Sequence, residues 1–373
     1  MMAASAINYF DRIAMSIAGP AIMQEQGFSA AQLGMAYSAF GAAYTIAMLP
    51  AGRLSDRFGP KRMLGMAGLA TAVLTAATGL SVSTLLLVRF WMGAFSAPLY
   101  PACGKLTANW FSPESIARVQ GFVIGAGAGG SAIAPVVFAA LMSRFGWRAA
   151  FVIAGTITAC FFFWWLARVR DFPGKPVEGK ARQGGWSRLL RSRPIILLSV
   201  SYFCVCYLYH IFDYWTYYYF REVRHMGDGP SALFTTFTQV VAMIMMPLGG
   251  WVSDFAGRRV VPILALTLSA TLLYAGTLAT GTVATVALLA LAFGLATSVE
   301  GSYWATTMEA GGASEASAYG IVNAAGNLGG FIAPLIVPLV AARLGWAWGL
   351  NSAGVAISVA VFCWLWLARA ART

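Results

Sequence analysis

The segment GRLSDRFGPKR, from Gly52 to Arg62, recurs in the chain as GWVSDFAGRR, from Gly250 to Arg259. Both copies keep the spacing Gly-x3-Asp-x2-Gly, and the second begins 198 residues after the first. Two other elements recur at the same offset to within one residue. They are GFVIGAGAGGSAIAP at 121–135, repeated as GIVNAAGNLGGFIAP at 320–334, and RFGW at 144–147, repeated as RLGW at 343–346. Three elements with one shared offset indicate a duplicated unit.

The composition places this duplicated chain in a membrane. Of the 373 residues, 59% are hydrophobic and only 10% are charged, and the mean hydropathy is +0.70. A soluble domain carries about 25% charged residues. The five cysteines lie in apolar stretches without metal-ligand spacing, so neither a disulfide framework nor a metal site is predicted.

Twelve apolar segments are each long enough to cross a hydrocarbon core of about 30 Å. They cover residues 1–23, 31–53, 62–81, 83–109, 117–142, 147–168, 194–220, 229–253, 260–279, 283–308, 316–341 and 346–368. The sequence therefore predicts an all-α membrane protein. It has an N-terminal six-helix bundle over 1–169, a linker over 170–193 and a C-terminal six-helix bundle over 194–373. Parallel tandem repeats in a membrane chain are typical of transporters with a substrate site near the midplane between the halves.

The distribution of Lys and Arg predicts the orientation. Eight of the 25 basic residues lie between Arg168 and Arg193, and most of the others lie in loops on the same side. We therefore expect a multi-pass protein of the inner membrane with a cytosolic linker and both termini cytosolic. The net charge of +12 follows from this topology and does not indicate a nucleic-acid partner, because the basic residues are spread over short loops.

Ionisable residues at membrane depth are costly, so each is a functional candidate. Asp11 and Arg12, in INYFDR, lie about 16 to 18 Å along the first helix. Neighbours on a helix point about 100° apart, which suits an acid that takes a proton and a base that meets an anion. Arg89 in the fourth span needs a carboxylate partner, either Asp11 or a substrate. The alternative for all three is a salt link that only fixes helix packing.

The duplicated loop predicts a gate on the cytosolic side. Asp56 can accept from a helix N-terminus or from Arg118, and Arg57 and Asp254 belong to the same repeated element. Contacts between helix ends can form in one conformation and break in another. A loop that only fixes the topology is the alternative.

The second half offers further polar residues within its spans. Asn323 and Asn327 lie one turn apart on the eleventh helix, where they can bond a substrate or simply join helices through amide bonds. Glu300 is a second candidate for a proton site.

Four segments of the chain resemble the major facilitator superfamily and, more narrowly, its anion:cation symporter branch. They are NYFDR at 8–12, GRLSDRFGPKR at 52–62, RFWMGAFSAPLYP with NWFSPESIAR at 89–118, and NAAGNLGGFIAP at 323–334. The resemblance implies that Asp11 binds the proton and that Arg89 senses its protonation or the substrate. It also implies that Tyr44, Asn323 and Trp304 contact the substrate. Where part of the branch has a glutamate in the fourth helix, this chain has Ser96, which cannot carry a proton at working pH.

These observations predict a secondary active transporter, a proton-coupled symporter of a small organic anion such as a sugar acid or an aromatic acid. We expect a monomer that needs no cofactor or metal and works by alternating access. An exporter, an exchanger or an uncoupled facilitator is the alternative. Enzyme activity is disfavoured, because the chain has only two histidines and no G-x-S-x-G motif.

Overall fold

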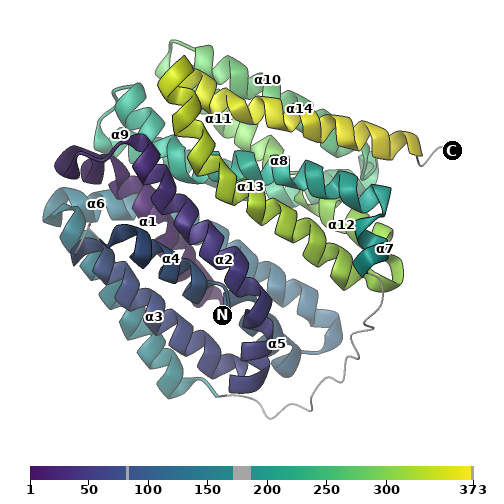
Figure 1. The fold of residues 1–373 in the computed structure, drawn as a ribbon, viewed down its shortest axis with the longest axis horizontal. Coiled ribbons are helices and arrows are strands. Elements are labelled where there is room, and N and C mark those ends of the chain that lie inside the picture. The colour runs from purple at the N-terminus through teal and green to yellow at the C-terminus, as the bar shows by residue number, and fades with distance from the viewer. Residues whose placement is uncertain (81–83, 171–185, 371–373) are drawn as a thin grey trace. The chain divides into compact units, whose positions relative to one another are not determined.

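The computed structural model describes residues 1–80, 84–170 and 186–370, and within these ranges all regular elements are helices (Figure 1). The first four predicted spans correspond to α1 (Met2–Gln26), α2 (Ala30–Phe58), α3 (Pro60–Leu80), and α4 (Leu85–Ser96) with α5 (Leu99–Trp110). The fifth and sixth predicted spans both lie in α6 (Pro113–Arg168). The last six correspond to α8 (Arg193–Tyr218), α9 (Asp228–Ala256), α10 (Val260–Leu278), α11 (Thr282–Thr297) with α12 (Glu300–Gly311), α13 (Glu315–Leu344) and α14 (Trp346–Ala370). Three short elements complete the described chain: α7 (Trp186–Leu190), a π-helical turn at Tyr219–Val223 and a 3-10 turn at Gly312–Ser314.

The chain forms two compact units. The first comprises Met1–Gly179 with His225–Thr236, and the second comprises Lys180–Arg224 with Phe237–Thr373. The domain boundaries expected from the sequence, at residues 169 and 194, stay a prediction.

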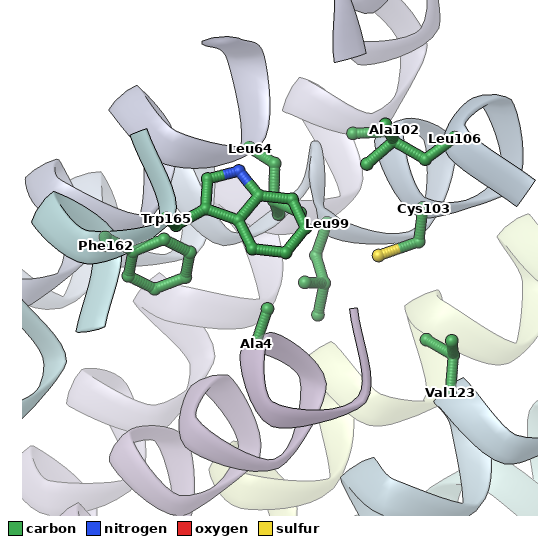
Figure 2. Packing of buried hydrophobic residues seen from close by; sticks show 9 residues of the cluster. All are labelled: Ala4, Leu64, Leu99, Ala102, Cys103, Leu106, Val123, Phe162 and Trp165. Atoms are coloured by element: carbon green, nitrogen blue, oxygen red, sulfur yellow. The ribbon is translucent and has the colours of Figure 1, made fainter. Parts of the chain in front are cut away.

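In the first unit, α6 packs along both α1 and α3, and α2 packs on α4. Figure 2 shows an apolar cluster formed by residues of α1, α3, α5 and α6, with the indole of Trp165 beside Leu64 and Leu99. The Trp165 Nε1 donates a hydrogen bond to the Lys61 carbonyl oxygen at 3.2 Å, which satisfies its polar atom. Because lipid tails are as apolar as these side chains, close packing rather than exclusion from water holds such helices together.

In the second unit, α8 lies against α13 and α14, and α10 lies against α11 and α14. The pairing of α8 with α13 repeats that of α1 with α6 in the first unit. At both crossings a glycine permits the contact. A Cβ on Gly130 would meet the backbone of Ala6, and a Cβ on Gly329 would meet the backbone of Phe203.

The backbone confirms the duplication. Gly146 breaks α6 with φ 76° and ψ 161°, and Gly345 ends α13 with φ 90° and ψ 160°. These two glycines are the third residues of RFGW and RLGW. The left-handed region is open to glycine at little cost, which explains why each copy has glycine there. Gly59 and Gly257, in the two copies of the first repeated loop, also have positive φ values of 81° and 100°.

Two spans expected to be continuous are each divided into two helices. The fourth span breaks between Ser96 and Leu99, where Pro98 lacks an amide hydrogen for the helix. The tenth span breaks between Thr297 and Glu300 without a proline. There the Thr297 and Ser298 hydroxyls donate to the carbonyl oxygens of Gly294 and Leu295, at 2.9 and 2.7 Å. Such back-bonding bends helices.

Candidate functional site

Asp11 is a buried carboxylate that accepts a hydrogen bond from a hydroxyl group of another helix. It lies on α1 with 1% of its surface exposed, and its Oδ2 accepts a hydrogen bond from Thr158 Oγ1 at 2.9 Å. Thr158 belongs to the part of α6 that follows Gly146, and Thr75 on α3 also faces the carboxylate. Sequence reasoning missed both threonines, because a threonine in an apolar helix gives no signal by itself.

Two guanidinium groups flank one aromatic ring near this carboxylate. The Arg89 guanidinium lies 5.0 Å from the centroid of Phe40, and that of Arg12 lies 5.2 Å from it. Arg89 is fully buried on α4 and lies within electrostatic range of Asp11. Phe40 in turn stacks on Tyr44, with 6.1 Å between the ring centroids. The structure therefore brings three predicted residues, Arg12, Arg89 and Tyr44, together around Phe40, which the sequence analysis did not single out.

Ser96 lies at the end of α4 and is buried. Its hydroxyl accepts a hydrogen bond from Asn8 Nδ2 on α1 at 3.2 Å. Ser96 and Asn8 thus form a neutral hydrogen-bonded pair between two helices.

In the second unit, Glu300 is surrounded by aromatic side chains. The Tyr202 hydroxyl donates to its two carboxylate oxygens at 3.1 and 3.3 Å. Trp304 lies on the same helix one turn later, 4.9 Å from the Tyr202 ring and 4.1 Å from the Tyr319 ring, measured between centroids. Glu300 and Trp304 therefore share one cluster, and its Tyr202 was missed because it is one of many aromatic residues between Tyr202 and Tyr218 of α8.

Asn323 and Asn327 lie on α13, and both are part-buried. Asn327 Nδ2 donates to the Asn323 carbonyl oxygen at 3.1 Å, within the same helix. Their expected contact with a substrate stays a prediction.

The predicted gate is described in part. The side chains of Asp56 and Arg118 lie outside the described residues. Arg57 is exposed, with its guanidinium 5.6 Å from the Phe58 ring centroid, and Asp254 is exposed on α9. The ion pair that the structure shows at this end of the second unit instead joins Arg258 to Glu309, at 2.6 Å. Glu309 was missed, although an acid at the end of a span next to a basic loop is a usable signal.

In the first unit, Glu25 near the end of α1 joins this helix to α6. Its carboxylate accepts from Trp147 Nε1 at 2.6 Å and pairs with Arg148. These hydrogen bonds hold the pKa of Glu25, which lies beyond the predicted first span, below its usual value. In the second unit, Trp346 instead packs on Trp215 and Tyr218, at 5.2 and 4.5 Å between ring centroids.

In the described part of the chain, no group of three His, Cys, Asp or Glu side chains could hold a metal ion. Eight helical stretches there are long and apolar enough to cross a membrane, and one of them, Val119–Arg168, covers two predicted spans. A multi-pass helical protein that gathers a carboxylate and two guanidinium groups among its helices is typical of membrane transporters.

The chain belongs to the Major Facilitator Superfamily, whose sequence model matches residues 1–317. It is therefore a transporter and not an enzyme. A probable sulfoacetate transporter of Cupriavidus necator is 26% identical over 370 residues, covering 91% of this chain and 85% of the relative. A hexuronate transporter of Bacillus subtilis is 26% identical over 366 residues, covering 92% and 86%. Such relatives confirm the resemblance to the anion:cation symporter branch.

Solved structures confirm the major facilitator fold. A bacterial homologue of the human lysosomal transporter Spinster, in an inward-facing and occupied conformation, matches with a TM-score of 0.87 and 15% identity. That match covers 99% of this chain and 95% of the other. A D-xylose–proton symporter matches with a TM-score of 0.80 and 17% identity, covering 97% and 95%. At this identity the likeness shows the fold alone.

Proposed function

We propose that the protein is a secondary active transporter that carries a small organic anion together with a proton by alternating access. The observation that carries the proposal is the pair of guanidinium groups, from Arg12 and Arg89, on the Phe40 ring beside the buried Asp11. The names of the relatives, which include transporters of sulfoacetate, hexuronate and galactarate or D-glucarate, support an anionic substrate such as a sugar acid.

The anion is the part of the substrate that the first unit is suited to bind. Two like charges held within an apolar region repel each other and are costly to bury. A carboxylate brought to them offsets both costs, because a guanidinium matches its two oxygens with parallel hydrogen bonds. We assign this role to Arg12 and Arg89, with Tyr44 as a neighbouring contact through its stack on Phe40.

The proton is assigned to Asp11. A carboxylate that alternates between a charged and a neutral form changes its interaction with Arg89, so protonation and anion binding are coupled. The Thr158 hydroxyl keeps the carboxylate in one place, since it donates to the charged form and accepts from the protonated form.

The remaining assignments follow the same proposal. In the second unit, Trp304, Asn323 and Asn327 are assigned to substrate contact, and Glu300 is a second candidate for proton binding. A gate on the cytosolic side consists of Asp56, Arg57, Arg118 and Asp254. The protein acts as a monomer in the inner membrane, with both termini cytosolic, and the proton gradient alone drives it without a cofactor.

The test is transport by purified protein in proteoliposomes. Radiolabelled glucuronate, galactonate and sulfoacetate are offered with an imposed pH gradient, to the wild type and to Asp11→Asn. We expect Asp11→Asn to lose accumulation against a gradient and to keep exchange of substrate across the membrane. Asp228→Asn is the matched control, because Asp228 is an exposed carboxylate at the start of α9.

Accumulation by Asp11→Asn at the wild-type level would overturn the coupling role of Asp11. Transport that never exceeds equilibration in the wild type, whatever the pH gradient, would favour an uncoupled facilitator or an exchanger.

A further inference from the structure

Glu300 lies at a break inside a membrane span. The tenth span runs from Thr282 to Gly311 and is divided into α11 and α12, and Glu300 is the first residue of α12. At 1.5 Å per residue, Glu300 lies about 27 Å from the first residue of the span and about 17 Å from the last. It is therefore inside the membrane, at the kind of helix discontinuity where transporters bind ions and substrates.

Among the described residues of the second unit, the side chains that face the Glu300 carboxylate are neutral. On α8 they are Tyr202, whose hydroxyl donates to it, and Tyr209, with Cys206 nearby. On α12 the Trp304 side chain lies beside the carboxylate, and on α13 Tyr319 stacks on Trp304. On α9 the backbone of Gly250 lies against Gly301, the residue that follows Glu300. Among the ion pairs of the described residues, none includes Glu300.

A lone charged carboxylate inside a membrane is costly, so a cation must accompany it in some step of the cycle. A metal ion needs several oxygen atoms with lone pairs turned towards it. Here the Tyr202 hydroxyl donates to the carboxylate, and the indole N–H of Trp304 is a donor only. These donors do not form a metal cage.

An organic ammonium group is a poor fit as well. It would need an open aromatic face beside the carboxylate. The Trp304 ring already stacks on Tyr319, with an interplanar angle of 28°, and meets Tyr202 at 67°. A proton needs no further ligand, because Tyr202 can donate to the carboxylate and can accept from the carboxylic acid.

We propose that Glu300 is a second proton site, located in the second unit and separate from Asp11; this inference rests on the proposed function. The Glu300 carboxylate takes a proton from water on one side of the membrane, forming an O–H bond, and the same bond breaks when the proton leaves on the other side. Each substrate is then carried with two protons.

The first unit supplies a contrast at its own broken span. There the polar residue at the break is Ser96, which is hydrogen-bonded to Asn8 and cannot carry a proton. The acid is thus found at the break of the tenth span and not at the break of the fourth.

Infrared difference spectroscopy tests the site without any substrate. Purified protein in lipid is brought from high to low pH, and the carboxylic-acid C=O band is compared in the wild type, Glu300→Gln and Asp11→Asn. We expect each substitution to remove a different part of the band. Tyr202→Phe keeps the acid but removes its donor, so it should shift the frequency of the Glu300 part. Glu222→Gln, which changes a carboxylate paired with its neighbour Arg221, is the control for pH effects elsewhere.

Transport gives the second measurement. Glucuronate is a monoanion, so two protons give a net charge of +1 per substrate and one proton gives zero. At equal pH on both sides, a potential step of about 60 mV should change wild-type accumulation tenfold. Glu300→Gln should not respond to that step.

If Glu300→Gln keeps the wild-type carboxylic-acid band and the wild-type response to the potential step, the second proton site is refuted. If Asp11→Asn also loses coupling in the same experiments, the proposed function is unaffected. Loss of neither band in the two variants would overturn both. Should Glu300→Gln fail to reach the membrane, an unshifted band in Tyr202→Phe would also refute the inference.

Discussion

Replacing Arg89 by lysine tests whether the guanidinium binds the anion or only balances charge. Arg89 is fully buried on α4, 5.0 Å from the Phe40 centroid, and its Nη1 lies 3.3 Å from Met92 Sδ. Lysine keeps the positive charge but lacks the planar fork that makes two parallel hydrogen bonds to a carboxylate. A hydrogen bond to a charged group contributes about 1.5 to 3 kcal/mol. Losing one of the two should weaken anion binding about 10- to 150-fold.

The measurement is equilibrium binding of the transported anion by purified Arg89→Lys, with the amount of folded protein checked by size-exclusion chromatography. Arg12→Lys should be weakened in the same way, since its guanidinium flanks the same ring. Arg258→Lys is the matched control, because that exposed arginine pairs with Glu309 away from Phe40. Near-normal affinity in both Arg89→Lys and Arg12→Lys would refute anion binding by the fork and would favour a neutral substrate.

Two other predictions concern the scaffold. Gly130→Val places a side chain against the backbone of α1 and should lower stability by about 1 to 3 kcal/mol. Gly129→Val is the control, because no heavy atom lies within 4 Å of a Cβ at that position, and it should leave the melting temperature unchanged. Equal melting temperatures of the two variants would contradict the close crossing of the helices. The folded-state pKa of Glu25 is below its ordinary value of 4.5, so its contribution to stability is complete above about pH 4.5 and is lost as the pH falls through the folded-state pKa. Glu25→Gln should therefore weaken the dependence of the melting temperature on pH over that acidic range. An unchanged dependence would show that Trp147 and Arg148 do not stabilise the charged form of Glu25 more than water does.

The fold could be predicted from the sequence because the duplication is recorded in residues that the backbone requires. Gly146 and Gly345 adopt positive φ values at equivalent places, so glycine had to be kept in both copies. The spans themselves followed from length and hydropathy. The breaks in the fourth and tenth spans were not predicted. The break after Thr297 depends on side-chain hydroxyls bonding to carbonyl oxygens, and serine and threonine are common in intact spans as well.

From the residues themselves, the part of the candidate site around Phe40 was predicted where charge identified it, and Tyr44 was added by the family resemblance. Asp11, Arg12 and Arg89 stand out because ionisable residues are rare within spans. Phe40 and Thr158 do not stand out, because a phenylalanine or a threonine in such a chain is ordinary. Their importance comes from their distances to charged residues on other helices, Phe40 to Arg89 and Thr158 to Asp11. These distances cannot be predicted from a single sequence.

The two units keep the same backbone features but differ in the side chains placed on them. At the end of the first unit near RFGW, Glu25 joins a tryptophan and an arginine, and at the equivalent end of the second unit Trp346 packs on the rings of Trp215 and Tyr218. At the broken spans, the first unit has a serine and the second has Glu300. A duplicated fold needs its glycines at both places, whereas ligand chemistry needs its charged groups at one. The positions where the copies disagree are therefore where binding and coupling are to be sought, and Arg89 and Glu300 are both such positions.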